Sequence, residues 1–259
     1  MSSELARFNV VLVGAGIISA SLLKHVVGMR DDEDDSDQHI IVITCNEGDE
    51  KRKAVDNTIE YLRRRDHVRI KTIYLDSSFN YVESWLVKCI HDNFEDEEIN
   101  DMNIYLGYTV EKYTKLDFGD DKINSIVQYP YMNMSYSFIT YHTLIFDKDL
   151  FDLTRSCDDP YNDYYCGKCQ ACLEIKNMLK VYYSLIYNDR QIALMRDYYR
   201  KFFKDEPKKV MVRSITLNGV EILIADDDSD NRYINYCNCQ TRTNKRRIIA
   251  SKKNPKTSK

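Results

Sequence analysis

The chain has 259 residues, a net charge of -4 and 43% hydrophobic residues, so it is long enough to bury the core of one main domain. Its longest apolar runs fall far below the ~18 residues of a membrane span, and no apolar segment before a cleavage site marks an N-terminal signal. We therefore expect a soluble, cytoplasmic protein with no membrane contact, whose cysteines stay reduced.

The first stretch, FNVVLVGAGIISASLLKHVVG (8–28), predicts a buried strand that turns through glycine into an apolar helix. Backbone N–H groups and the helix dipole point at such a turn, which favours an anion such as phosphate. The acidic run 31–37 predicts an exposed loop. HIIVITCNEG (39–48) predicts a second buried strand, and an apolar stripe at helical spacing over 49–65 completes a βαβ unit.

Four more elements are expected before the cysteine-rich segment: a strand at 69–75, a helix at 81–90 with Trp85 on its core face, a strand at 102–109 and a fifth strand at 137–146. Alternating strands and helices predict an α/β fold, with a Rossmann-like, mostly parallel sheet and helices on both faces. In such sheets ligands bind at the carboxyl ends of the strands. The loops after Val13, Thr44 and Leu106 should therefore share one edge.

The C-terminal third changes character. Residues 173–204 are expected to be helical, and two apolar runs around Asn218-Gly219 predict a β-hairpin. The expected domains are an α/β domain at 1–205 that includes a zinc loop at 156–172, a small β appendage at 206–241 and a basic tail at 242–259. The tail predicts either a contact with nucleic acid or a solubilising segment.

Four of the eight cysteines, Cys157, Cys166, Cys169 and Cys172, follow the pattern C-x8-C-x2-C-x2-C. Two-residue gaps let thiolates converge on one zinc ion, about 2.3 Å from each sulfur, and four sulfurs leave no position open for substrate. The pattern thus predicts a structural zinc site. Gly167 suits the tight turn between two ligands. Two disulfides or unrelated buried thiols remain the alternatives.

The cluster ends in CGKCQAC, and it follows a strand, a glycine turn and a central strand with Gly-x-x-x-Glu. This order of parts resembles the QueC family of 7-cyano-7-deazaguanine synthases, which are PP-loop ATP pyrophosphatases. The resemblance covers about residues 8–185. It implies bound zinc, ATP and magnesium, and a deazapurine ligand. The implied reaction is an ATP-dependent ligation in queuosine biosynthesis that converts 7-carboxy-7-deazaguanine and ammonia to 7-cyano-7-deazaguanine.

On the family pattern S-G-G-x-D-S, the chain keeps Gly16 and Ser19 but has Gly14 for the leading serine and Ile18 for the acid. The nucleotide-binding residues that the resemblance implies are Gly14, Ala15, Gly16, Ser19, Ser21, Asn46 and Gly48. The loss of the acid predicts weak or absent ATP turnover. The turn also approximates the dinucleotide fingerprint G-x-G-x-x-G, which would indicate an oxidoreductase, or it is a structural turn without a ligand.

The stretch GYTVEKYTKLDF resembles the family's substrate loop, and the substrate-binding residues that this implies are Gly107, Glu111, Tyr113 and Asp117, with Lys148 facing a phosphate. A solvated loop and a surface lysine are the alternatives. The family's V-P-x-R-N stretch is shortened here to residues 78–80 and lacks its arginine.

Three functions therefore remain open at this point. The chain is a deazapurine synthase of the QueC type, a catalytically inactive binding or scaffold protein of the same fold with a nucleotide or protein partner, or a dinucleotide-dependent oxidoreductase. The five histidines show no spacing typical of a metal site. Cys237 and Cys239 are too close together for the usual paired ligation of one zinc ion.

Overall fold

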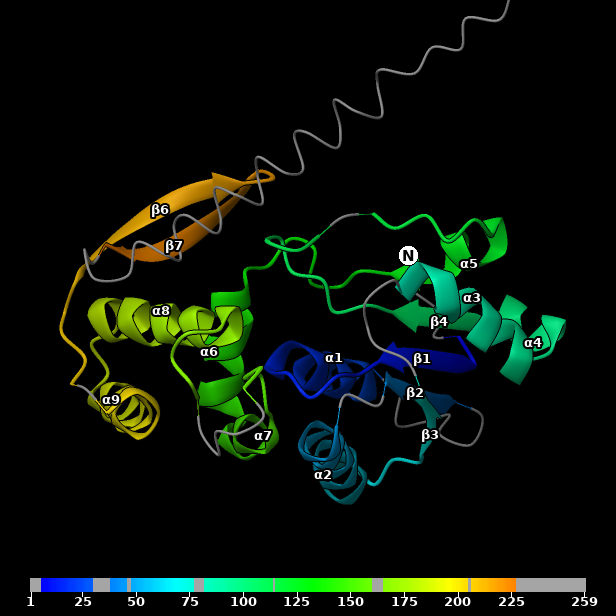
Figure 1. Ribbon diagram of the computed structural model, residues 1–259, viewed down its shortest axis with the longest axis horizontal. Coiled ribbons are helices and arrows are strands. Elements are labelled where there is room, and N and C mark those ends of the chain that lie inside the picture. Colours follow the sequence, from blue (N-terminus) through cyan, green and yellow to red (C-terminus); the bar gives the residue numbers. More distant parts are fainter. Residues whose placement is uncertain are drawn as a thin grey trace, which may run out of the picture. The chain divides into compact units, whose positions relative to one another are not determined.

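A computed structural model of the chain describes residues 6–29, 38–45, 48–76, 82–113, 115–159, 165–204 and 206–226. The chain divides into two compact units, Met1–Tyr161 and Asn162–Lys259. The first unit contains a five-stranded parallel sheet with helices, and the second contains two helices and an antiparallel strand pair (Figure 1). The α/β class and the C-terminal β appendage expected from the sequence are thus confirmed.

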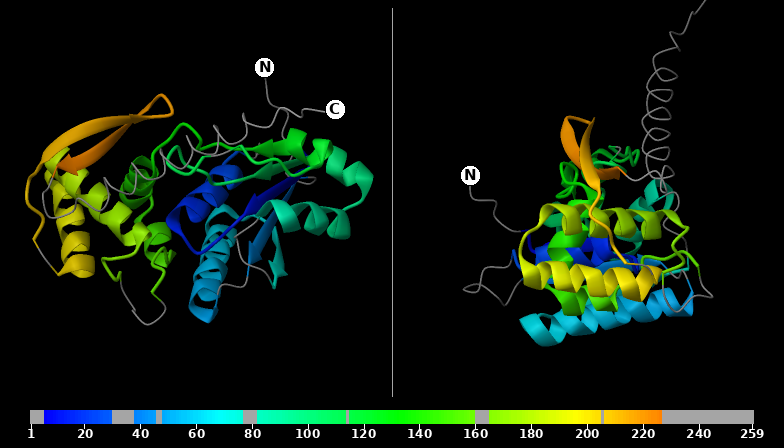
Figure 2. Two further views of the ribbon diagram at one scale, coloured as in Figure 1. Left: turned by 45° about the horizontal axis from the view of Figure 1, so that its top comes forward. Right: turned by 90° about the vertical axis from the view of Figure 1, so that its left-hand side faces the viewer.

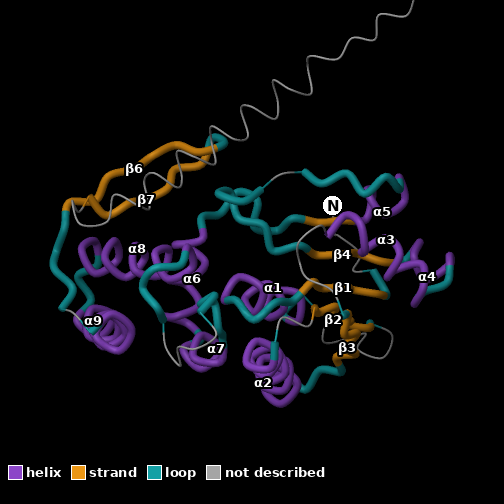
Figure 3. The backbone as a smooth tube through the Cα atoms, viewed as in Figure 1, coloured by secondary structure: helices purple, strands orange, loops and turns teal. Residues whose placement is uncertain are grey.

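The sheet of the first unit has the strand order β3-β2-β1-β4-β5, and every neighbouring pair is parallel. Figure 3 shows β3, β2, β1 and β4 side by side. Its strands are β1 (Phe8–Leu12), β2 (His39–Cys45), β3 (Ile70–Leu75), β4 (Met102–Tyr105) and β5 (Val127–Gln128). β1 and β2 are almost wholly buried, as expected of strands that are covered on both faces.

Seven helices belong to this unit among the described residues: α1 (Ile17–Val27), α2 (Asp49–Asp66), α3 (Val82–Asn93), α4 (Asp96–Asn100), α5 (Asp121–Ile126), α6 (Tyr136–Phe146) and α7 (Lys148–Leu153). Alternate residues of β1 face opposite layers. Val11 joins a cluster with residues of α1, α2 and α6, whereas Val10 joins one with residues of α3, α4 and α5. The fold is therefore a three-layer α/β/α sandwich.

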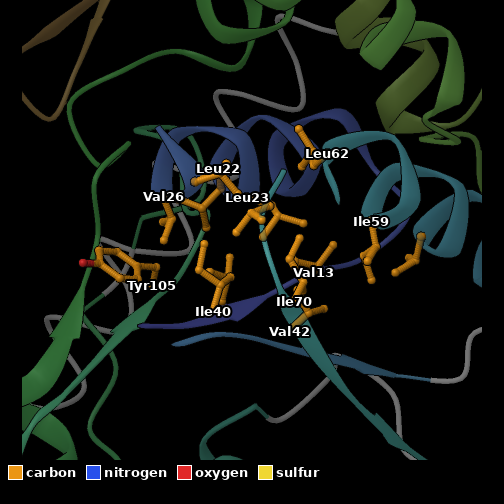
Figure 4. Close-up of a cluster of buried hydrophobic side chains, with 14 of the residues drawn as sticks. Val13, Leu22, Leu23, Val26, Ile40, Val42, Ile59, Leu62, Ile70 and Tyr105 are labelled. Carbon is orange, nitrogen blue, oxygen red and sulfur yellow. The ribbon is translucent and has the colours of Figure 1, made fainter. Parts of the chain in front are cut away.

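Figure 4 shows the first of these clusters, in which Leu22, Leu23 and Val26 of α1 pack against Ile40 and Val42 of β2. These five side chains are at most 2% exposed. Burying a side chain of this size stabilises a fold by roughly 1.5–3 kcal/mol. The face of α1 that carries these residues is consequently fixed against the sheet, and the turn before the helix is fixed with it.

The strand order places a topological switch point between β1 and β4. From β1 the chain proceeds outward to β2 and β3, and it then returns to the other side of β1 to form β4 and β5. Connections that leave in opposite directions open a crevice at the carboxyl ends of the two central strands, which is where ligands of such sheets bind. The glycine turn after β1 and the loop after β4 both lie at this edge.

The expected strand at 137–146 is wrong, because these residues form helix α6 (Tyr136–Phe146). Its many aromatic and β-branched residues favour strands, but they also satisfy a helical spacing. Tyr136, Ile139 and Thr143 are buried on one side. Ser135 caps the helix by accepting a hydrogen bond from the Phe138 N–H at 3.1 Å. The short β5 takes the fifth position in the sheet instead.

The second unit contains α8 (Gln170–Leu185), α9 (Asp189–Phe203), β6 (Met211–Leu217) and β7 (Val220–Asp226). The expected helical stretch 173–204 is two helices, because Asn188 caps a new helix by accepting from the Gln191 N–H at 3.2 Å. The hairpin packs on α8, as Figure 2 shows. Asn177 fixes it there by donating to the Leu223 carbonyl at 3.2 Å and accepting from the Ala225 N–H at 2.9 Å.

The expected domain boundary at residue 205 differs from the division of the structure, which falls between Tyr161 and Asn162. The reason is that the hairpin packs on α8 and so belongs with the two helices before it. The acidic loop 31–37 and the basic tail 242–259 lie outside the described residues. Within the described part of the chain, no helix is both long and apolar enough to cross a membrane.

Candidate functional site

The four cysteines of the C-x8-C-x2-C-x2-C pattern come together in the structure. The sulfur atoms of Cys157, Cys166, Cys169 and Cys172 all lie within 4.8 Å of one another. Cys157 and Cys172 are buried, whereas Cys166 and Cys169 are partly exposed. The predicted grouping of these residues is confirmed, and no disulfide joins any two of the four.

The local backbone shapes this cluster. Gly167 has φ +70°, a left-handed conformation that glycine adopts without the strain of a Cβ. The turn directs the N–H groups of Lys168 and Cys169 at the Cys166 sulfur, with N···S distances of 3.4 and 3.3 Å. Cys169 is the N-cap of α8 and Cys172 lies in its first turn, where the positive end of the helix dipole stabilises a thiolate.

The arrangement fits a tetrahedral metal ion. Two sulfurs on a zinc ion with bonds of about 2.3 Å and tetrahedral angles are about 3.8 Å apart. The sulfurs of Cys166 and Cys172 are separated by 3.8 Å, far beyond the about 2.05 Å of a disulfide bond. Four thiolates around one ion leave no position for water or substrate. These cysteines can therefore hold a structural zinc ion, which would stabilise the segment rather than carry out a reaction.

The residues just before the cluster contact the glycine turn. The Arg155 N–H donates to the Ala15 carbonyl at 2.7 Å, and the Ser156 hydroxyl accepts from the Ile17 N–H at 3.1 Å. Gly16 is the N-cap of α1 and has no side chain to cap the helix, so Ser156 supplies that cap from far along the chain. One N–H group that the sequence offered to a phosphate is consequently already bonded within the protein.

A small hollow of about 140 Å³ lies at the switch point of the sheet. The predicted nucleotide residues Gly14 and Ser19 line it together with the predicted substrate residue Gly107. The other lining residues are Leu12, Val82, Leu106 and Tyr108. The structure thus brings two sequence-predicted segments together at one edge of the sheet. In the third segment, Asn46 lies outside the described residues, and Gly48 is not among the residues that line this hollow.

Ile18, at the position where the QueC resemblance would place an acid, packs toward the loop after β4. A Cβ on Gly107 would lie 3.2 Å from Ile18 Cγ2 and 3.5 Å from Leu22 Cδ2, which is a tight approach. Glycine at 107 therefore lets the loop pass close to α1. An isoleucine methyl group accepts no hydrogen bond and binds no magnesium, so this contact is one of packing.

Glu111, a predicted substrate residue, is only 5% exposed, and both of its carboxylate oxygens accept from the Tyr136 N–H, at 3.0 and 3.1 Å. Burial raises the pKa of this carboxyl group, although the Tyr136 N–H offsets part of the effect. The negative charge lies at the N-terminus of α6, where the helix dipole favours it. Glu111 thus has a structural partner in the fold, and it is not among the residues that line the hollow.

The remaining predicted residues lie apart from the hollow. Tyr113 stacks edge-on with Tyr129, and Asp117 accepts hydrogen bonds from the Gly119 N–H and the Asn124 amide. Lys148 pairs with Asp152 one turn later in α7. Their assignment to substrate binding stays a prediction, and these contacts give each of them a local role in the described fold.

Two other nucleotide predictions have distinct surroundings. Gly48 is the N-cap of α2 with φ +102°, so glycine is required there by the backbone. Ser21 points away from the Gly14 hollow, because its hydroxyl lies 3.2 Å from the Tyr131 hydroxyl and lines a second hollow between α1 and α6. Ser19 and Ser21 are two residues apart on a helix, which places them on opposite faces.

The sequence reasoning missed Asp147, which is 7% exposed. Its carboxylate binds Lys24 Nζ of α1 at 2.7 Å, the Arg65 guanidinium and Tyr61 hydroxyl of α2, and the Leu150 N–H of α7. An aspartate just before a helix is an N-cap signal, but the expected strand up to residue 146 concealed it. The Asp147 carboxylate therefore links α1, α2 and α7 beside the sheet.

A scan of protein-family models, a search of curated proteins and a search of solved structures each found no match to this chain.

Proposed function

We propose that this protein binds a phosphate-bearing nucleotide or a deazapurine at the switch point of its sheet and does not turn it over, with a structural zinc ion in the adjacent cysteine cluster. The observation that carries this proposal is the hollow lined by Gly14, Ser19 and Gly107. It supports the inactive-binding alternative of the QueC resemblance, in which the fold and the metal segment are retained and catalysis is lost.

The position of the hollow favours an anionic group, and its volume limits the size of that group. It lies at the edge of the sheet where phosphates bind in doubly wound folds, beside the N-terminus of α1. The N–H groups of Ile18 and Ser19 lie in the first turn, where they have no acceptor within the helix. A hollow of about 140 Å³ is smaller than the roughly 300 Å³ at which pockets for whole drug-sized ligands begin. One phosphate group would therefore enter, while the rest of a nucleotide stays outside.

Three features argue against turnover. Ile18 supplies no carboxylate, Ser156 already accepts the Ile17 N–H, and both oxygens of Glu111 face the Tyr136 N–H. Phosphoryl and nucleotidyl transfer depend on charges that are positioned in advance of the reaction. Within the described residues, no side chain lining the hollow is charged. Binding without reaction is what such a site supports.

The binding test is calorimetric titration of the purified protein with ATP and, separately, with inorganic phosphate. We expect saturable binding of both that weakens at least tenfold in Gly107→Val, because an added side chain meets Ile18, and several-fold in Ser19→Ala. Ser21→Ala is the matched control, since its hydroxyl lines the other hollow, and it should bind as the wild type does. Equal binding by Gly107→Val would contradict the assignment of the site.

The turnover test incubates the protein with ATP, magnesium, ammonia and 7-carboxy-7-deazaguanine. We expect no pyrophosphate and no product at the mass of 7-cyano-7-deazaguanine. The double variant Gly14→Ser with Ile18→Asp should not restore activity, because the family's arginine is also absent. Steady product formation by the wild type would replace this proposal with that of an active synthase.

A further inference from the structure

A second and larger hollow, of about 490 Å³, lies between α1 and α6 in the first unit. Residues of α1, the segment before α6 and α6 itself form its three walls: Ser21, Lys24, His25, Gly28, Met29, Pro130, Tyr131, Met134, Phe138, Ile139, His142 and Thr143. Its volume falls within the roughly 300–1,000 Å³ of small-molecule sites. It is separate from the Gly14 hollow, because the two use opposite faces of α1.

The wall residues combine a rigid floor with an open aromatic rim. Tyr131, Ile139 and Thr143 are buried and fixed by the core. Phe138 is 47% exposed and Met134 is 39% exposed, an unusual exposure for two large apolar side chains at the mouth of one hollow. Aromatic and thioether groups offer favourable contacts to the face of a flat ring. The rim thus favours a planar ligand.

The charges around the hollow are already balanced. Lys24 is the one lysine or arginine in its described walls, and its ammonium group lies 2.7 Å from the buried Asp147 carboxylate. Burial lowers the pKa of His25, so its ring is neutral at pH 7 and offers one donor and one acceptor. A charged ligand would lose its hydration here without an opposing charge in return.

Polar groups are few, and they converge on the α1 wall. The hydroxyls of Ser21 and Tyr131 lie 3.2 Å apart, and the His25 ring lies 6.0 Å from the Tyr131 ring, tilted by 45°. A small number of placed donors and acceptors in an apolar hollow fixes the orientation of a ligand through its hydrogen-bonding edge.

We propose that this hollow is a binding site for an uncharged, planar heteroaromatic molecule, with its ring between Phe138, Met134 and the α1 wall and its polar edge toward His25, Ser21 and Tyr131. The site is independent of the nucleotide site at the switch point. If this face only docked a partner protein through its exposed aromatic side chains, it would not require the concave floor.

The test titrates the full chain with 7-azaindole, a neutral bicyclic ring with adjacent donor and acceptor nitrogens, and follows binding by ligand-observed NMR. Saturable binding is expected, and indole-3-carboxylate should bind at least tenfold more weakly because of its charge. Gly28→Leu should weaken 7-azaindole at least tenfold by filling the hollow. An added Cβ at Gly28 lies 3.5 and 3.6 Å from its nearest neighbours, so the backbone tolerates a side chain.

Matched variants distinguish specific binding at this site from nonspecific binding to the protein surface. Phe138→Ala removes the rim and should weaken 7-azaindole at least fivefold, and His25→Phe, which keeps a ring but removes its nitrogens, should do the same. Phe146→Ala, on the same helix and 69% exposed but outside the hollow, should change the affinity less than twofold. Ser19→Ala should also leave it unchanged, whereas it weakens ATP binding at the other site.

Three results would overturn the proposal: no saturable binding by the wild type, equal binding by Gly28→Leu, or equal affinity for the carboxylate. Sedimentation provides a further check. A concentration-dependent dimer that Phe138→Ala abolishes would show that a second copy covers this face, and the small-molecule assignment would then be wrong.

Discussion

Asp147 is a buried carboxylate that binds groups from three helices. Burial alone would raise its pKa, but hydrogen bonds from Lys24, Tyr61 and the Leu150 N–H outweigh burial and lower the pKa below the ordinary value. The charged form is therefore the form that the fold stabilises. A carboxyl group whose pKa is lower in the folded state contributes stability above its unfolded pKa of about 4, and this contribution is lost as the pH falls through the folded pKa.

Asp147→Asn should destabilise the first unit by about 2 kcal/mol at pH 7. This value lies between those of exposed and fully buried ion pairs, because Lys24 and Arg65 are about one-third exposed. Urea unfolding followed by Trp85, the single tryptophan, reports on this unit. The difference should begin to shrink as the pH falls below about 4, the unfolded pKa, and it should be lost only at a lower pH, once the carboxyl group of the folded wild type is also protonated.

Glu60→Gln is the control for this substitution, because Glu60 pairs with Arg63 and Arg64 on the exposed face of α2. It should cost about 0.5 kcal/mol or less. If Asp147→Asn lowers the free energy of unfolding no more than this control does, the contacts of the Asp147 carboxylate contribute little to stability.

Cys172→Ser should remove the metal, because the site loses one of four thiolates. Elemental analysis should give one zinc per wild-type chain and less than about a tenth of that in the variant. Ligation energy is folding energy in such sites, so the variant should be at least about 3 kcal/mol less stable, or about 10 °C lower in melting temperature. Cys89→Ala changes a buried cysteine outside the cluster and should keep its zinc. Full zinc content in Cys172→Ser would refute the assignment.

At the scale of elements, the C-terminal hairpin is set by its turn. Asn218 and Gly219 have φ +51° and +81°, the two left-handed residues of a type I′ turn, whose twist matches that of the strands. The register of β6 with β7 then follows from Leu217 paired with Val220. Asn177 of α8 holds the second strand by its backbone, so turn and helix fix the hairpin together.

Gly219→Ala should destabilise the hairpin by about 1–2 kcal/mol, because a Cβ is strained in the left-handed region. Faster hydrogen exchange at the amides of β6 and β7 would measure this. Gly28→Ala is the matched control: its φ is −76° and an added Cβ makes ordinary contacts, so its effect should stay within about 0.5 kcal/mol. Unchanged exchange in Gly219→Ala would mean that packing alone sets the hairpin.

At the scale of the whole molecule, the two residues just before the first cysteine ligand contact the glycine turn within the first unit. Arg155 and Ser156 contact Ala15 and Ile17, and the first ligand, Cys157, follows directly. A metal bound to Cys157 would therefore also help to hold Ser156, the cap of α1, in place.

Chelation of the wild type should lower its melting temperature to about that of Cys172→Ser and should leave that variant unchanged. It should also release four thiols to a thiol reagent, since they are no longer bound to the metal. Calorimetric scans before and after chelation, followed by zinc addition, measure both effects. A wild-type melting temperature that does not respond to chelation would show that no metal stabilises the fold.

The sequence alone determined the features that depend on local chemistry. The strand and turn of residues 8–16, the buried strand that begins at His39, the Asn218-Gly219 hairpin and the cysteine cluster follow from apolar runs, turn residues and ligand spacing, which the chain carries wherever it folds. The parallel α/β class followed from their alternation.

Only the tertiary structure decided what depends on long-range contacts. Residues 137–146 have strand propensity, but they form a helix, and Glu111 and Ser135 accept hydrogen bonds from N–H groups in its first turn. Asp147 links helices only because α1 and α2 place Lys24 and Arg65 next to its carboxylate. Ser19 and Ser21 line different hollows because a helix turns about 100° per residue. Local patterns set which elements form, whereas the packing of distant elements sets which side chains meet.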